Sequence, residues 1–142
     1  MEFFLTKPIH ISLDAMGGDY APDIIINGAA QAKLRYPNLI FSFFGDQTKL
    51  NPLLKDLHLS SFSNVIHTNE VINSSDKPST ALRKGKNSSM GMSIQLVKLG
   101  EADAIVSAGN TGALMAMSKL ILRPIDGIIR PAIAACFPTI NG

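Results

Sequence analysis

The sequence predicts an α/β protein whose open, mostly parallel sheet is covered by helices on both faces, giving three layers. Two features indicate this fold. Short apolar runs alternate along the chain with segments whose apolar residues recur at helical spacing. Several of these runs end directly at a glycine or an aspartate, as strands do when a loop leads into the next helix. A length of 142 residues suits one domain with a single core.

The strand-like and helical segments follow one another strictly. Strand-like runs cover residues 9–13, 39–44, 65–66, 104–106 and 132–137. Helical patterns cover residues 22–36, 50–57, 79–100 and 111–122, with an interruption expected near residues 85–88. Pro22 suits a first helical turn, and that helix must stop before Pro37. The fifth strand-like run comes almost at the end of the sequence, so we expect a sheet that is incomplete at its C-terminal side.

Composition narrows the class of protein. Hydrophobic residues make up 46% and charged residues 17%, which is a globular rather than a disordered balance. A net charge of +2 is too small to indicate nucleic acid as a partner. Cys136 is the only cysteine and lies in an apolar run, so we expect a core residue in a reducing compartment. The first residues resemble neither a signal peptide nor a membrane span, which predicts a cytoplasmic protein.

Two glycine-bearing loops are the main candidates for a binding site. One, at residues 14–19, contains Gly17 and Gly18; the other, at residues 107–112, contains Gly109 and Gly112. Each follows a strand and precedes a helix, where parallel sheets bind ligands and helix N–H groups bind anions. Neither loop matches a Walker A or a G-x-G-x-x-G pattern. The alternative, that the glycines serve only tight turns, is equally compatible with the sequence.

A basic stretch precedes a second helix start. Lys77, Arg83, Lys84 and Lys86 lie shortly before Ser88 and Ser89. Cations beside a helix N-terminus favour an anion site, although such a run is more often a solvated helix face. The three histidines are far apart without ligand spacing, so no metal site is expected.

Seven segments of the chain follow one family in order. They are residues 13–19, 77–83, 88–90, 96–100, 102–104, 107–115 and 127–132. Together they resemble the bacterial phosphate acyltransferases of phospholipid synthesis, and the run S-A-G-N-T-G-A-L-M at 107–115 is highly specific. The resemblance covers nearly the whole chain but less than half of a usual family member. It implies that residues 1–142 are the N-terminal part of a single Rossmann-like domain of the isocitrate and isopropylmalate dehydrogenase kind.

The resemblance also implies an activity and its partners. A fatty acyl group would pass from acyl carrier protein to inorganic phosphate, giving acyl phosphate. Phosphate would attack the thioester directly, so no cofactor is expected. The family forms homodimers and works beside the inner face of the membrane, in functional partnership with a membrane glycerol-3-phosphate acyltransferase.

Roles for individual residues follow from this resemblance as hypotheses. Gly109, Asn110, Thr111 and Gly112 would cradle phosphate or the oxyanion, with Gly17 and Gly18 as the opposing wall. Arg83 and Lys86 would supply positive charge. Asp14 and Asp19 would orient donors or the loop, and Ser88, Ser89 and Ser107 would complete the phosphate side.

Three alternatives remain at this point. The chain could be a phosphotransacetylase-like enzyme that uses acyl-coenzyme A, or a dehydrogenase of the isopropylmalate type. It could also be an inactive truncated fragment that at most binds a partner.

Overall fold

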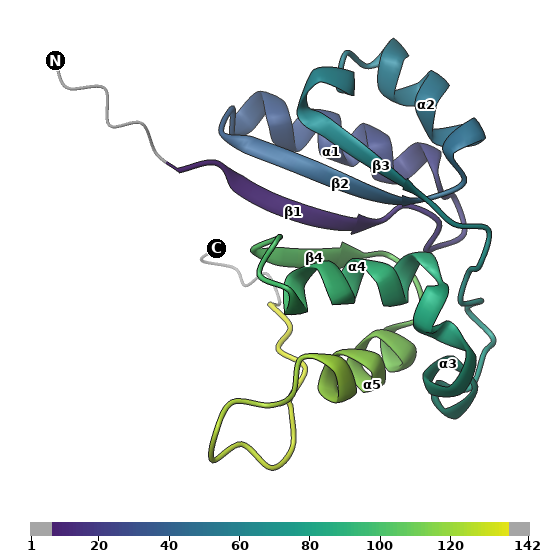
Figure 1. The fold of residues 1–142 in the computed structure, drawn as a ribbon, viewed down its shortest axis with the longest axis vertical. Helices are drawn as coiled ribbons and strands as arrows, with labels where there is room; N and C mark the ends of the chain where they lie inside the picture. The colour runs from purple at the N-terminus through teal and green to yellow at the C-terminus, as the bar shows by residue number, and fades with distance from the viewer. Residues whose placement is uncertain (1–6, 137–142) are drawn as a thin grey trace, which may run out of the picture.

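Four parallel strands and five α-helices make up the fold, which a computed structural model describes for residues 7–136 (Figure 1). The strands are β1 (Ile9–Asp14), β2 (Leu39–Gly45), β3 (Ser63–His67) and β4 (Ala104–Ser107). The helices are α1 (Asp23–Arg35), α2 (Gln47–Asp56), α3 (Pro78–Lys84), α4 (Ser89–Lys98) and α5 (Thr111–Ile121), with 3₁₀ turns at Ser60–Phe62 and Gly85–Asn87. The predicted α/β fold and its first four strands are therefore confirmed.

The sheet has the strand order β3-β2-β1-β4, and every neighbouring pair is parallel. Strand order reverses at β1, which pairs with β2 on one side and β4 on the other. Asp14 is paired with Ser107, so the loops after β1 and β4 leave the sheet next to each other. A reversal of this kind is the usual place for a ligand in an open α/β sheet.

Helices α1 and α2 cover one face of the sheet through an apolar cluster. Its buried members are Leu13, Ala15, Ile25, Ile26, Ala29, Phe41, Phe43, Leu50, Leu54 and Leu59. The strands contribute every second residue, as expected for side chains that alternate between two faces. Strand β2 is also buried on its other face, where Phe44 is 3% exposed, which explains why residues 39–44 are almost wholly apolar.

The opposite face of the sheet is covered by α4, with α5 packed against α4 and α3 packed against α5. A second cluster holds these helices together, with Ile72, Ala81, Met90, Ile94, Ala113 and Met117 as its buried members. The strand residues under α4 are more polar. Ser12 Oγ donates to the carbonyl of Ser93 in α4 over 3.0 Å, and both serines are fully buried. A seam of small polar side chains thus separates β1 from α4.

The expected break in the helical region 79–100 is present and has a local cause. Ser88 caps α4 by accepting from the Gly91 N–H over 3.1 Å, and its hydroxyl donates to the Gly85 carbonyl over 2.6 Å. A Cβ at Gly91 would collide with that same carbonyl. The turn at Gly85–Asn87 therefore folds tightly onto the first turn of α4.

The fifth strand predicted at residues 132–137 is wrong for residues 132–136, which form no strand and are exposed (Phe137 lies outside the described residues). Cys136 is accordingly exposed rather than a core residue. Apolar composition alone does not make a strand, because a strand requires a hydrogen-bonded neighbour. In the described sheet no strand pairs with the outer edge of β4.

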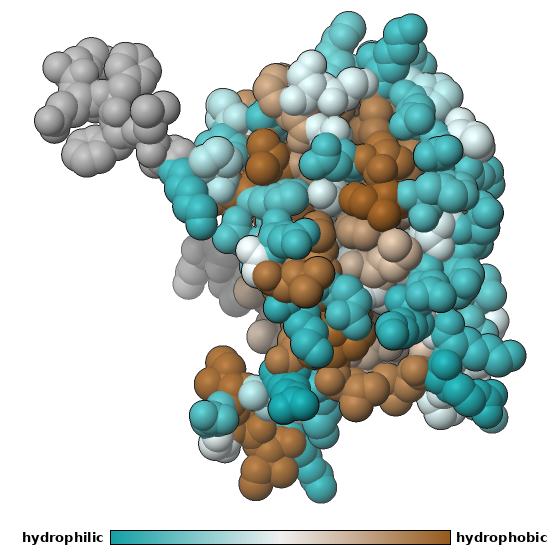
Figure 2. Space-filling model, in the orientation of Figure 1, coloured by the Kyte–Doolittle hydropathy of each residue, from teal (hydrophilic) through white to brown (hydrophobic). Residues whose placement is uncertain are grey.

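Hydrophobic side chains are unusually visible around the segment that follows α5 (Figure 2). They include Ile125, Ile128, Ile129 and Ile133, each more than half exposed. Across the described part of the chain, no helix combines the length and apolar character that crossing a bilayer requires.

Candidate functional site

The two glycine loops lie in direct contact at the carboxyl ends of β1 and β4. A Cβ at Gly17 would collide with the carboxylate of Asp14 and lie 2.9 Å from Ser107 Oγ. A Cβ at Gly109 would lie 3.2 Å from the Gly17 Cα. Gly18 has a φ of +103°, in the left-handed region that favours glycine. The glycines therefore let two backbones approach each other, beyond any role in turning the chain.

A buried carboxylate lies beneath this contact. The Ser107 hydroxyl donates to Asp14 Oδ2 over 2.7 Å, and the same hydroxyl accepts from the Gly109 N–H over 3.1 Å. Asp14 is only 1% exposed. The carboxylate thus fixes the hydroxyl, and the hydroxyl fixes the first N–H of the second loop.

Asn110 fastens the start of α5 to the loop before α3. Its Oδ1 accepts from the Ala113 N–H over 2.9 Å, which is an N-cap. Its Nδ2 donates to the carbonyls of Asn73, Ser74 and Asp76, the shortest contact being 2.8 Å to Asp76. Both ends of the side chain are therefore engaged, which leaves the backbone of Asn110 to meet a ligand.

Free donors remain at the start of α5. Among residues 7–136, none accepts from the N–H groups of Asn110, Thr111 or Gly112. Thr111 is exposed, and its neighbours are partly so. The positive end of the helix dipole reinforces these donors, and such a group of N–H bonds can hold an anion.

Ser88 and Ser89 lie inside the molecule, 1% and 0% exposed. Ser88 is occupied as the cap of α4. The Ser89 N–H donates to the Glu70 carbonyl over 2.9 Å, while its hydroxyl has no partner among the described residues. Asp19 is exposed in the first loop.

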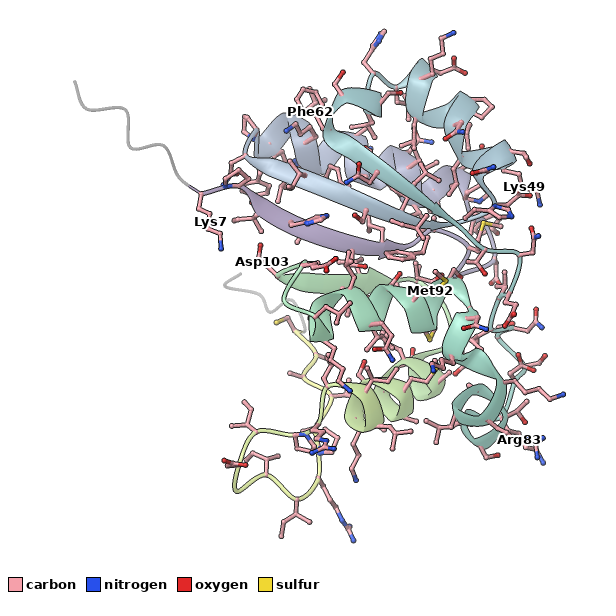
Figure 3. All side chains as sticks on the ribbon, viewed as in Figure 1. Lys7, Lys49, Phe62, Arg83, Met92 and Asp103 are labelled. Carbon is pink, nitrogen blue, oxygen red and sulfur yellow. The ribbon has the colours of Figure 1, made fainter. Side chains whose placement is uncertain are left out.

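The basic side chains are dispersed. Arg83 is exposed and points outward from α3, away from the strand ends (Figure 3). Lys86 lines a hollow with Leu82, Gln95 and Met117, alongside the middle of α5. The structure thus brings Asp14, Gly17, Ser107 and Gly109 together, and it places Arg83 and Lys86 elsewhere.

Lys77 belongs to the basic stretch, and the residues on either side of it contact the second loop. Its neighbour Asp76 accepts from Asn110 through its carbonyl, and its neighbour Pro78 lies 3.3 Å from where a Cβ of Gly112 would be. The signal in the sequence was its position directly before a Pro-initiated helix, which makes it the N-cap residue of α3.

Comparison with known proteins identifies a family and several relatives of the chain. A family model described as "Fatty acid synthesis protein" matches residues 9–142. The chain belongs to this family. Relatives of the chain include the phosphate acyltransferase of Azorhizobium caulinodans, 51% identical over 140 residues, and that of Rhodospirillum rubrum, 48% identical over 139 residues. The phosphate acyltransferase of Shewanella amazonensis is 47% identical over 134 residues.

The shared region is most of this chain and a smaller part of each relative. The match covers 97% of the chain and 39% of the Azorhizobium caulinodans protein, and 97% and 40% for Rhodospirillum rubrum. For Shewanella amazonensis the shares are 93% and 39%. The chain therefore spans about two fifths of the length of these fatty acid synthesis proteins, and it corresponds to their N-terminal portion.

Proposed function

We propose that this chain forms the phosphate-holding part of an acyltransferase that transfers a fatty acyl group from acyl carrier protein to inorganic phosphate, giving acyl phosphate for phospholipid synthesis. The names of the relatives support the reaction class. The observation that carries the proposal is the set of free N–H groups at Asn110, Thr111 and Gly112, held in place by the bonds from Asp14 through Ser107 to Gly109.

The chemistry needs little beyond binding and charge. An oxygen of phosphate attacks the thioester carbonyl carbon, an oxyanion forms, and its collapse releases the carrier thiolate and acyl phosphate. The N–H groups of the second loop hold phosphate or stabilise that oxyanion, because aligned donors stabilise developing negative charge. Gly17 and Gly18 form the opposing wall. No nucleophilic side chain and no cofactor take part in this route.

Positive charge acts on the bound phosphate from two distances. Lys77, whose neighbours Asp76 and Pro78 contact the second loop, supplies positive charge there, while Arg83 and Lys86 contribute at longer range. Asp14 does not touch phosphate, since two anions would repel each other. Its role is to orient Ser107, and exposed Asp19 orients the first loop.

A single N–H group can be tested at Thr111. Thr111 is the first residue of α5, where proline is tolerated, and Asn110 has an extended backbone (φ −62°, ψ 108°) that suits the residue before a proline. Thr111→Pro therefore removes one N–H while preserving the helix. Thr111→Ala is the matched control for the side chain.

We expect Thr111→Pro to weaken inorganic phosphate binding about tenfold relative to Thr111→Ala, as the loss of one hydrogen bond to a charged group would. Calorimetry or amide chemical shifts during a phosphate titration measure the affinity. Equal affinity of the two variants, each shown to be folded, would remove the start of α5 from the site.

Turnover separates this proposal from its alternatives. The protein is incubated with phosphate and, in separate reactions, acyl carrier protein thioesters, coenzyme A thioesters and NAD-linked substrates. Acyl phosphate formed from the carrier thioester supports the proposal, whereas preference for coenzyme A indicates a phosphotransacetylase-like enzyme. A folded chain that binds phosphate without turnover would be an inactive fragment of the enzyme.

The wider setting is part of the same proposal. The protein acts in the cytoplasm at the inner face of the membrane, as a homodimer that delivers acyl phosphate to a membrane glycerol-3-phosphate acyltransferase. Sedimentation velocity tests the dimer, and co-sedimentation with liposomes tests the membrane association. A monomer that does not co-sediment with liposomes would overturn the proposed dimer and membrane association, without affecting the proposed phosphate site.

A further inference from the structure

The polar seam between β1 and α4 contains two buried oxygen atoms that no described residue satisfies. They are Oδ1 of Asp14 and Oγ of Ser89. Both residues are at least 99% buried. A buried oxygen without a hydrogen bond is strongly unfavourable, and such atoms usually bind an ordered water molecule or another ligand.

The hydrogen bonds of the seam define how β1 and α4 are aligned. Ser12 Oγ donates to the carbonyl of Ser93, and Ser93 Oγ donates to the carbonyl of Ser89 over 2.7 Å. Asp14 lies two residues beyond Ser12 on the same face of β1, an advance of about 6.6 Å. Ser89 lies four residues before Ser93 on the same face of α4, an advance of about 6 Å.

The step from Ser12 to Asp14 and the step from Ser93 back to Ser89 point in the same direction, because the helix and the strand are antiparallel. Helix α4 runs antiparallel to β1 and β4, because the strand arrows in Figure 1 point towards the end at which α4 begins beside α3. Met90, the neighbour of Ser89, confirms the alignment at the loop end, because its Cε lies 3.3 Å from where a Cβ of Gly109 would be. Ser89 therefore belongs to the same level of the seam as Asp14.

We propose that Asp14 Oδ1 and Ser89 Oγ hold a buried water molecule that bridges β1 to the start of α4. The water donates one hydrogen to the carboxylate and exchanges a second hydrogen bond with the hydroxyl. Water fits because the site is polar and supplies two partners. A cation is disfavoured, since two oxygen atoms are too few ligands and Ser89 lies at the positive end of α4.

This water extends the support of the second loop into the helical layer. The connection then runs from Ser89 through the water to Asp14, onward to Ser107, and ends at the Gly109 N–H. Ser89 is in this sense a positioning residue for the loop. That functional reading rests on the proposed phosphate site, whereas the water site itself does not.

The sign of a stability change tests the site. If the water is bound, Ser89→Ala deprives it of a partner and lowers the urea midpoint, by about 1 M for a typical buried hydrogen bond. It also moves the amide signal of Gly109. If the hydroxyl is merely desolvated, removing it raises the midpoint, which would overturn the proposal, as would an unchanged midpoint.

Ser93→Ala is the matched control, because Ser93 is buried on the same face of α4 and its hydroxyl bonds only within the helix. We expect the Gly109 signal to stay in place in this variant. An equal shift in both variants would mean that general loosening of α4, and no water bridge, moves the loop.

Direct observation keeps the proposal testable even if Ser89→Ala fails to fold. A crystal structure of the unsubstituted protein that shows ordered water should contain density at about 2.7–3.2 Å from both oxygen atoms. A direct bond between them, or no density, would refute the site. Failure of phosphate to bind the same protein would instead count against the proposed function alone.

Discussion

Ser107 and Asp14, which are 93 residues apart in the chain, are joined by a hydrogen bond of 2.7 Å from the serine hydroxyl to the buried carboxylate. The two residues are also register partners across β4 and β1. This pair is the last one between β1 and β4, at the carboxyl ends of the strands where both glycine loops begin. Loss of this hydrogen bond should therefore lower the stability of the fold and loosen the second loop.

Ser107→Ala should lower the free energy of unfolding by about 2 kcal/mol, because a hydrogen bond to a charged group is lost and the carboxylate stays buried. Ser107→Thr keeps the hydroxyl and should lose less. Urea unfolding measures both variants. Equal stability of Ser107→Ala and the unsubstituted protein would contradict the importance of the pair.

Gly17→Ala should destabilise the protein by about 1–3 kcal/mol, since the added methyl group would collide with the Asp14 carboxylate and Ser107. Gly28→Ala is the matched control. Gly28 lies within α1 with no atom near its missing side chain, so alanine there should stabilise the helix by about 0.5–1 kcal/mol. Thermal unfolding distinguishes opposite signs readily; a neutral Gly17→Ala would show that the loops are not tightly packed.

Asn110→Asp should separate the two roles of the asparagine. Aspartate keeps the capping oxygen for Ala113 but cannot donate to the carbonyls of Asn73, Ser74 and Asp76. We expect faster amide exchange in residues 73–76, with α5 preserved. Asn110→Ala should in addition lose about 1 kcal/mol from the missing cap. Unchanged exchange in both variants would refute the fastening role.

Asp46 should make stability depend on pH in the acid range. The Thr48 hydroxyl and N–H donate to its carboxylate over 2.7 and 2.9 Å and hold its pKa below the ordinary 3.8. The stabilisation is therefore complete above pH 3.8 and is lost as the pH falls through the lower pKa of the folded state. The stability difference between the protein and Asp46→Asn should shrink accordingly in acid. A stability difference between the two proteins that stays constant with pH would contradict this role of Asp46.

Local signals predicted most of the fold. Pro22 and Pro37 bracket α1, and the break near Gly85 is where Ser88 caps α4. These features depend on residues a few positions apart, which a sequence displays directly. The fifth strand failed because its apolar pattern is local, whereas a strand exists only with a neighbour.

The interior of the site could not be predicted in the same way. The sequence indicated both glycine loops, but their contact depends on β4 pairing with β1 rather than with β3, and strand order leaves no local trace. It also predicted that Asn110 would meet a ligand, while three carbonyls from residues 73–76 engage its amide. Roles assigned to phosphate-binding residues remain predictions.

The polar seam also determines how the molecule can open. The face of the sheet towards α1 and α2 is joined by a broad apolar cluster, whereas the face towards α4 presents Ser12, Asp14 and Ser42. The cluster on that side has fewer buried members, so we expect the layer of α3, α4 and α5 to be the less protected cooperative unit. During native-state hydrogen exchange its amides should exchange before those of β1 and β2. The loop at residues 107–112 would then unfold while α1, α2, β1 and β2 are still folded.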